Sequence, residues 1–235
     1  MFTRTSAKRR TTKIGTVLTA AAVAVGGLIA SVATPATGQL AGASADPCAP
    51  VELIFARGRH EQPGVGRIGD ALVGGLNARL PQPVGVYAVN YPANNDFASG
   101  ANDISNRIQY MAGACPNTRL IVGGYSLGAA SAVMALSATQ KGFGFGRPLP
   151  PGMDAHVAAV VLVGNFSNRM GADGIGPAYR DRTIDLCNGT DPVCSNSRPA
   201  SIAELADDWQ NHLQDGYIGG GFIDRGAEFA AARVR

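Results

Sequence analysis

Ser126 lies at the centre of Gly124–Gly128, which reads Gly-Tyr-Ser-Leu-Gly, a pattern that can present a serine hydroxyl as a nucleophile. A β-branched run precedes this pentapeptide and an alanine-rich run follows it, so we expect a strand, a sharp turn and a helix. The first N–H groups of that helix would point toward a reacting group on the serine. A serine that only caps a helix is the alternative. The strand and helix on either side favour the nucleophile.

A serine hydroxyl is a weak nucleophile and needs an adjacent base, and the chain contains three histidines. In hydrolases built on this turn, the serine comes first in the chain, then an acid, then the histidine. His60 precedes Ser126, and His156 is expected to open a strand at the opposite edge of the sheet. His212 is therefore the predicted general base.

Asp191 is the predicted acid that orients the histidine. It follows the last predicted strand and lies between Cys187 and Cys194, whose disulfide would hold a carboxylate in register. A turn without catalytic role is the alternative, because Asp191 precedes a proline. Three other aspartates stay open for the same role: Asp173, Asp181 and Asp185.

An oxyanion hole needs two positioned N–H donors. One is expected from the residue after the nucleophile, Leu127, and the other from the loop after the first strand. In that loop the backbone N–H of Arg59 is the candidate. A solvated loop charge is the alternative interpretation of this arginine.

Gly64–Gly69 matches the G-x-G-x-x-G pattern of dinucleotide sites. Seven residues separate it from the preceding strand, and the second strand does not end in an acid, so a nucleotide site is not expected. The histidines are far apart in the chain and the cysteines are expected to be oxidised, which disfavours a metal site. We predict neither a cofactor nor a metal.

The elements that must position these residues alternate between strands and helices. Five apolar, β-branched runs predict strands at Val51–Ala56, Val84–Tyr91, Thr118–Gly123, His156–Gly164 and Thr183–Cys187. Helical spacing occurs at Ile68–Leu80, Ala101–Ala114, Leu127–Thr139 and Phe222–Val234. This alternation predicts an α/β fold with a mainly parallel sheet covered on both faces. The loops after the strands, at the carboxyl edge, are where ligands bind in such sheets.

Residues 1–45 read as a secretory signal, with a basic start, an apolar run and an Ala-x-Ala cleavage site at Ala43–Ala45. An uncleaved membrane anchor is the alternative. The positive net charge of +3 belongs to this segment, because residues 46–235 carry 15 basic and 17 acidic residues. The expected catalytic domain is therefore acidic by two charges and has no basic patch for nucleic acid.

Four cysteines in an exported chain predict two disulfides. Cys48 and Cys115 each precede a predicted strand, so both are expected at the amino edge of the sheet. Cys187 and Cys194 follow a strand, at the opposite edge, too far away to pair with the first two. The favoured pairs are Cys48–Cys115 and Cys187–Cys194.

Taken together, these motifs resemble the cutinases, and more closely the secreted cutinase-like serine esterases of mycobacteria and other actinobacteria. The resemblance covers residues 46–235 and rests on Phe55–Gly58, Gly85–Pro92, Gly124–Gly128, Cys187–Cys194 and His212–Leu213. It implies a small α/β-hydrolase with a central, mostly parallel five-stranded sheet and two disulfides. It also implies that Ser126, Asp191 and His212 form a catalytic triad, with Leu127 and Arg59 at the oxyanion hole.

Two residues depart from the family pattern. The family commonly has glutamine at the position of Leu127, and serine or threonine at that of Arg59, where the hydroxyl assists the oxyanion. Losing that hydroxyl is expected to weaken catalysis. The stretch from Ser195 to Gln210 is longer than in compact cutinases.

The expected function is hydrolysis of short- to medium-chain acyl esters by a secreted monomer that makes transient contact with a lipid surface or the cell envelope. Six apolar side chains are candidates for the acyl site: Phe97, Leu127, Phe166, Ile175, Trp209 and Ile218. Three alternatives are a secreted lipid- or envelope-binding protein of the same fold with weak or no turnover, an acetyl-carbohydrate esterase and a serine peptidase.

Overall fold

A computed structural model describes residues 48–167, 174–196 and 198–235. The predicted signal, residues 1–45, and one candidate acid, Asp173, lie outside these ranges. Five strands form one parallel sheet in the order β2-β1-β3-β4-β5. They are β1 (Val51–Ala56), β2 (Gly85–Ala88), β3 (Arg119–Tyr125), β4 (Val157–Val163) and β5 (Thr183–Leu186). The predicted α/β fold is confirmed.

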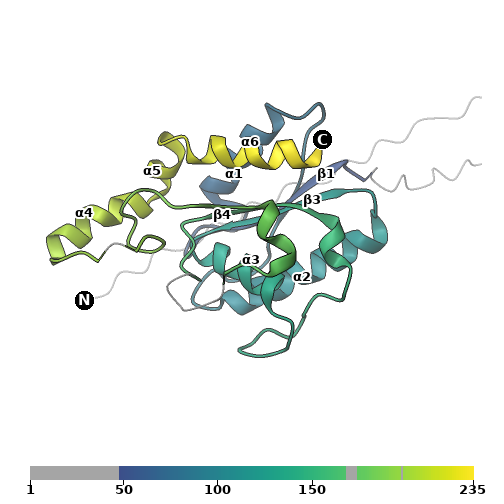
Figure 1. Ribbon diagram of the computed structural model, residues 1–235, viewed down its shortest axis with the longest axis horizontal. Coiled ribbons are helices and arrows are strands. Elements are labelled where there is room, and N and C mark those ends of the chain that lie inside the picture. Colours follow the sequence, from purple (N-terminus) through teal and green to yellow (C-terminus); the bar gives the residue numbers. More distant parts are fainter. Residues whose placement is uncertain (1–47, 168–173, 197) are drawn as a thin grey trace, which may run out of the picture. The chain divides into compact units, whose positions relative to one another are not determined.

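Helices cover both faces of the sheet (Figure 1). On one face lie α1 (Gly66–Asn77) and α6 (Phe222–Val234), and on the other lie α2 (Phe97–Ala114) and α3 (Leu127–Ser137). Each face of the sheet has its own hydrophobic core, and alternate residues of a strand belong to the two cores. Leu53 and Phe55 pack on the face of α1, whereas Ile54 packs on the opposite face. The central strands are therefore apolar on both faces, which explains their continuous hydrophobic runs.

Several predicted boundaries differ from the structure. The helix expected from Ala101 begins at Phe97, because the Asp96 carboxylate accepts the Ser99 N–H at 3.0 Å and caps the helix. The edge strand β2 is shorter than its apolar run. His156 closes a 3-10 helix (Met153–His156) before β4, and a second 3-10 helix (Pro177–Arg182) precedes β5.

The stretch after β5 contains a helix that the sequence analysis does not predict, α4 (Ile202–His212). A shorter helix, α5 (Gln214–Gly219), follows it. The Ser201 hydroxyl accepts the Glu204 N–H at 3.1 Å, so the Ser-x-x-Glu capping pattern was the sequence signal for α4. Among the described residues, no helix is long and apolar enough to cross a membrane.

Both predicted disulfides are confirmed. Cys48–Cys115 joins residues 67 positions apart, and Cys187–Cys194 closes a loop of residues seven positions apart. The first ties the segment before β1 to the segment before β3. The second shapes the loop after β5, at the edge of the sheet where the candidate site lies.

Candidate active site

Ser126 lies at the turn between β3 and α3 with φ 54° and ψ −115°. This backbone conformation is unfavourable for any residue other than glycine. The neighbouring glycines make the turn possible. A Cβ on Gly128 would lie 2.0 Å from the Ala56 carbonyl oxygen, and a Cβ on Gly124 would lie 2.3 Å from Gly128. The predicted strand–turn–helix is confirmed, with the serine at its apex.

His212 is the last residue of α4 and is buried. Its Nε2 lies 3.0 Å from Ser126 Oγ. The Tyr125 ring stacks on the imidazole with centroids 5.4 Å apart, and the Tyr125 hydroxyl donates to the His212 carbonyl. Gly164 leaves room for the ring, because a Cβ there would come within 3.1 Å of His212 Cε1.

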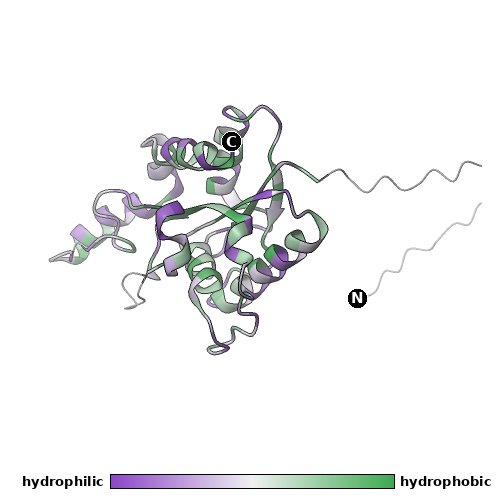
Figure 2. Ribbon diagram, turned by 45° about the vertical axis from the view of Figure 1, so that its right-hand side comes forward, coloured by the Kyte–Doolittle hydropathy of each residue, from purple (hydrophilic) through white to green (hydrophobic). Residues whose placement is uncertain are grey.

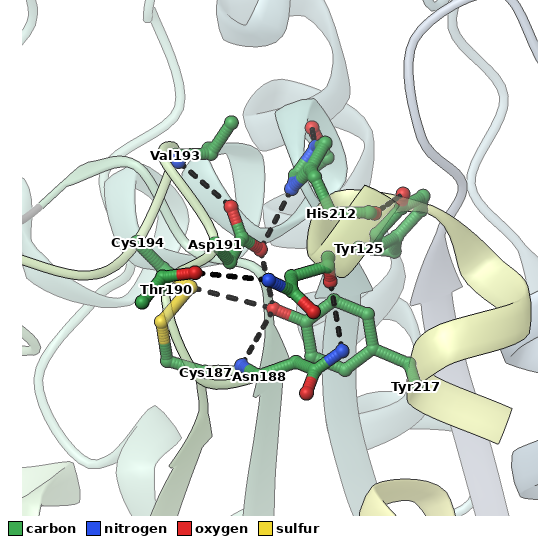
Figure 3. Close-up of polar contacts among 11 residues, drawn as sticks. Tyr125, Cys187, Asn188, Thr190, Asp191, Val193, Cys194, His212 and Tyr217 are labelled. Atoms are coloured by element: carbon green, nitrogen blue, oxygen red, sulfur yellow. Dashed lines mark hydrogen bonds and ion pairs between the residues drawn. A yellow bond between two sulfur atoms is a disulfide. The ribbon is translucent and has the colours of Figure 1, made fainter. Parts of the chain in front are cut away.

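Asp191 is fully buried and faces the other side of the imidazole (Figure 3). Its Oδ2 lies 2.8 Å from His212 Nδ1, and its Oδ1 accepts the Val193 N–H at 2.7 Å. A carboxylate at Nδ1 keeps the proton on that nitrogen, which leaves Nε2 free to accept the Ser126 proton. The three predicted residues are thus brought together in the order that proton transfer requires.

Tyr217, in α5, has a buried side chain whose role sequence reasoning missed. Its hydroxyl donates to Asp191 Oδ2 at 2.6 Å and accepts the Asn188 N–H at 3.2 Å (Figure 3). The same carboxylate oxygen therefore receives hydrogen bonds from an imidazole and a phenol. A lone tyrosine five positions after a histidine carries no recognisable pattern, so only the fold could reveal this contact.

The pKa of Asp191 reflects two opposing influences. Burial acts to raise it, but the hydrogen bonds from His212 and Tyr217 outweigh burial and hold the pKa below the usual 3.8. Burial, reinforced by Asp191, raises the pKa of the Tyr217 phenol. The pair is therefore an ionised carboxylate beside a neutral phenol at physiological pH.

The remaining candidate residues lie elsewhere. Asp185 accepts a hydrogen bond from Asn165 at 3.0 Å within β5, and Asp181 belongs to the 3-10 helix before that strand. His156 precedes β4 at the amino edge of the sheet, and His60 lies in an exposed turn. None of these four contacts Ser126 in the described hydrogen-bond network.

The loop after β1 is organised by Glu61, which the sequence did not single out. Its carboxylate accepts the Gly58 N–H at 2.6 Å and the Arg67 N–H, in the first turn of α1, at 3.1 Å. The exposed Arg59 side chain reaches Asn95 at 3.4 Å. Leu127 opens α3, where the first N–H groups have no partner within the helix. The oxyanion roles of Arg59 and Leu127 stay predictions.

Glu61 also bears on the G-x-G-x-x-G motif. A carboxylate already occupies the start of α1, where a phosphate would bind in a dinucleotide site. For metals, Cys187, Asp191 and Cys194 place potential ligand atoms within 4.8 Å of one another. Both sulfurs are in a disulfide, so this set offers no thiolate.

A cleft of about 540 Å³ opens above Ser126 and His212. Three of the predicted acyl-site residues, Leu127, Phe166 and Trp209, line it. The other three do not: Phe97 packs against Phe166 from the core, Ile175 packs against the same core, and Ile218 is partly exposed outside the cleft. Further lining comes from residues not predicted for this role: Asn95, Val193, Leu213 and Gln214. The cleft is apolar on several sides and is of a size suited to a small organic ligand.

The chain matches the family model described as Cutinase over residues 47–217. It is similar to a Mycobacterium tuberculosis protein named "Probable carboxylesterase Culp2", with 48% identity over 189 residues, 80% of this chain and 81% of the relative. It is also similar to "Phospholipase Culp4" of the same species, with 43% identity over 236 residues, 98% of this chain and 95% of the relative.

Solved structures show the same fold at lower identity. "A novel cutinase-like protein from Cryptococcus sp." has a TM-score of 0.60 and 24% identity, covering 78% of this chain and 94% of that one. An acetylxylan esterase has a TM-score of 0.62 and 19% identity, covering 80% of this chain and 100% of that one. The two relatives and the family match agree on the chemistry of ester hydrolysis, and the solved structures agree on the fold.

Proposed function

Since the chain belongs to the cutinase family and is a carboxylic ester hydrolase, we propose that Ser126 is its nucleophile, His212 its general base and Asp191 the orienting acid. The observation that carries this proposal is the relay from Asp191 Oδ2 through the imidazole to Ser126 Oγ, with steps of 2.8 and 3.0 Å. Both distances lie within the range for proton transfer between side chains.

The reaction begins when Ser126 Oγ attacks the ester carbonyl carbon while His212 Nε2 takes the hydroxyl proton. The oxyanion accepts N–H bonds from Leu127 and Arg59. When the tetrahedral intermediate collapses, the imidazolium returns its proton to the departing alcohol, and an acyl-serine remains. Water then attacks this ester with His212 as base, which releases the carboxylic acid and restores the serine.

We propose short- to medium-chain acyl esters as substrates. Leu127, Phe166, Val193, Trp209 and Leu213 give the cleft an apolar lining that suits an acyl chain, and its volume of about 540 Å³ suits a chain of limited length. Arg59, Asn95 and Gln214 also line the cleft, so an acetyl-carbohydrate esterase, whose substrate is mostly polar, is the second candidate. Arg59 supports the other alternative, a binding protein with weak or no turnover, because the family commonly has a serine or threonine hydroxyl at this position.

Hydrolysis of p-nitrophenyl esters from acetate to palmitate tests the proposal. We expect a maximum at short or middle chain lengths and a loss in Ser126→Ala of about a thousandfold or more. An Asp185→Asn variant, which changes a carboxylate outside the relay, is the control and keeps its activity. Hydrolysis by Ser126→Ala that equals hydrolysis by the unmodified protein would refute the assignment of the nucleophile. If the unmodified protein hydrolyses none of the esters, the binding protein is favoured.

We further propose that residues 1–45 direct export and that residues 46–235 are the exported enzyme. The two disulfides support this, because such bonds persist in oxidising compartments outside the cytosol. The mass of the exported chain tests the cleavage position.

A further inference from the structure

The cleft above Ser126 has two chemically different sides. The sheet order β2-β1-β3-β4-β5 places the loops after β1 and β2 on one side of Ser126, which follows β3, and the loops after β4 and β5 on the other. Phe166, after β4, and Val193, after β5, are apolar residues of the lining. Arg59, after β1, and Asn95, after β2, are polar residues of the lining. An ester bound at the serine would therefore lie between an apolar side and a polar side.

Helix α4 and the residues after it add to both sides. The helix carries hydrophilic and hydrophobic residues (Figure 2), and Trp209 and His212 are its residues in the lining. The Trp209 ring lies 5.3 Å from the His212 ring, whose partner Asp191 follows β5, so Trp209 extends the apolar side. Gln214 donates to Glu61, in the loop after β1, at 3.4 Å. Gln214 therefore belongs to the polar side.

Arg59 gives the polar side a positive charge. It is the only arginine or lysine among the described residues that line the cleft, and no aspartate or glutamate is among them. The ion pairs of the described residues do not include Arg59. Its guanidinium donates to the neutral Asn95 amide oxygen at 3.4 Å. A guanidinium has several N–H donors, so others remain for a ligand in the cleft.

Three acids adjoin the polar side in the chain, and each already has a partner. The Glu61 carboxylate accepts two backbone N–H groups, and Asp96 caps α2. Asp215 forms an ion pair with Arg67. These contacts hold the acids in place without neutralising Arg59. The charge of Arg59 is therefore available to a bound molecule.

Resting on the proposed ester hydrolase function, we propose that Arg59, held by Asn95, forms an anion-binding subsite, and that the preferred substrates are esters whose alcohol carries a carboxylate or phosphate. A guanidinium can bind two oxygens of either group through parallel hydrogen bonds. The apolar acyl chain suits the side formed after β4 and β5, so the anionic group belongs to the alcohol on the opposite side. The apolar side also lowers the local dielectric, which strengthens the attraction.

Two esters that differ in charge and have nearly the same size test the subsite. 3-Carboxyphenyl butyrate is anionic at neutral pH, whereas 3-carbamoylphenyl butyrate is not. The measured quantity is the ratio of their kcat/KM values, corrected for their rates of alkaline hydrolysis. We expect the unmodified protein to favour the carboxylate. A ratio of one or less, with both esters hydrolysed, would overturn the proposal and leave the esterase assignment standing.

Arg59→Gln removes the charge and keeps the backbone N–H. We expect the ratio to fall about tenfold, because a hydrogen bond between charged groups is lost. Both esters present the same carbonyl to the serine, so a change at the oxyanion hole cancels in the ratio. Arg59→Lys keeps the charge without the planar pair of donors and should lower the ratio less.

Arg67→Gln is the matched control, since it removes the same charge from an exposed arginine that does not line the cleft. Equal ratios in Arg59→Gln and Arg67→Gln would overturn the proposal. Salt supplies a test without substitutions. Raising sodium chloride from about 0.01 to about 1 M shortens the screening length from about 30 to about 3 Å, so the ratio of the unmodified protein should fall. A ratio that does not depend on salt would also overturn the proposal.

A second pair of esters, 1-butyrylglycerol 3-phosphate and 1-butyrylglycerol, tests phosphate in the same way. Preference for either anionic ester supports the subsite and identifies the group, and competition by inorganic phosphate shows whether the free anion binds there. If no ester is hydrolysed through Ser126, the esterase assignment fails. The affinities of Ser126→Ala for the two phenyl butyrates, measured by calorimetry, then test the subsite alone, and equal affinities would overturn it.

Discussion

Asp191 shares one carboxylate oxygen between the imidazole of His212 and the phenol of Tyr217. Each donor restrains the carboxylate, and the Val193 N–H restrains the other oxygen. Two donors on one oxygen divide its negative charge, so the phenol moderates how strongly Asp191 holds a protonated imidazole. Tyr217 is in this sense a positioning residue for the proposed relay, since it touches neither the serine nor the cleft.

Replacing Tyr217 by phenylalanine removes the phenol oxygen and keeps the ring. We expect kcat to fall about tenfold with KM unchanged, because loss of a hydrogen bond to a charged group is worth about 1.5–3 kcal/mol and part of that orients the imidazole. The acid limb of the kcat/KM profile moves to higher pH. Tyr110→Phe, at a tyrosine that is 60% exposed, is the control. An unchanged pH profile in Tyr217→Phe would reduce the phenol to a space-filling role.

The same variant changes acid stability in a defined direction. The folded-state pKa of Asp191 is lowered from 3.8, so its ionised form stabilises the fold above that pH. This stabilisation is lost as the pH falls through the folded-state pKa. Without the Tyr217 hydrogen bond that pKa rises, and acid unfolding of Tyr217→Phe, followed by circular dichroism, begins at higher pH than in the unmodified protein.

At the scale of elements, the two disulfides act on different properties. The chain-entropy estimate gives about 4 kcal/mol for the long Cys48–Cys115 loop and about 2 kcal/mol for the short Cys187–Cys194 loop. The short loop, however, holds Asp191 against His212. We therefore expect Cys187→Ala/Cys194→Ala to lose more activity, and Cys48→Ala/Cys115→Ala to lose more stability.

Denaturant unfolding and kcat at a temperature where both variants are folded separate the two effects. Each disulfide variant serves as the control for the other. A larger loss of kcat in Cys48→Ala/Cys115→Ala would contradict the prediction, since that disulfide lies at the opposite edge of the sheet from Ser126.

The elements that sequence patterns predicted well are those whose residues are buried on both sides. Continuous apolar runs predict the strands around Ile54 and Val122, and the flanking glycines predict the turn at Ser126. Helix α4 was missed although its capping pattern, Ser201-x-x-Glu204, and the apolar spacing after it are present in the sequence. The contact of Tyr217 with Asp191 joins residues 26 positions apart and depends on how α5 returns to the loop after β5.

At the scale of the whole molecule, the proposed catalytic residues come from three separate parts of the chain and meet at the carboxyl edge of the sheet. Ser126 follows β3, Asp191 follows β5, and His212 ends α4. The second disulfide stands at this edge, while the first holds the opposite edge near β1. The two disulfides thus crosslink the chain at both ends of the parallel strands. Under the proposed export, both bonds would form in the oxidising compartment where the chain folds.

The export proposal makes a prediction about the whole chain. The exported protein should begin at Asp46, lack free thiols and carry the net charge of −2 that remains when five basic residues are removed. Signal peptidases require small residues at the cleavage site, so Ala45→Phe should block processing and leave the 45-residue extension in place. Intact mass and thiol titration of the exported protein measure both, with Ala41→Phe as the matched control outside the Ala-x-Ala site. A full-length chain recovered in the membrane fraction with Ala45 unchanged would instead indicate an uncleaved anchor, and the enzyme would then act from the membrane surface.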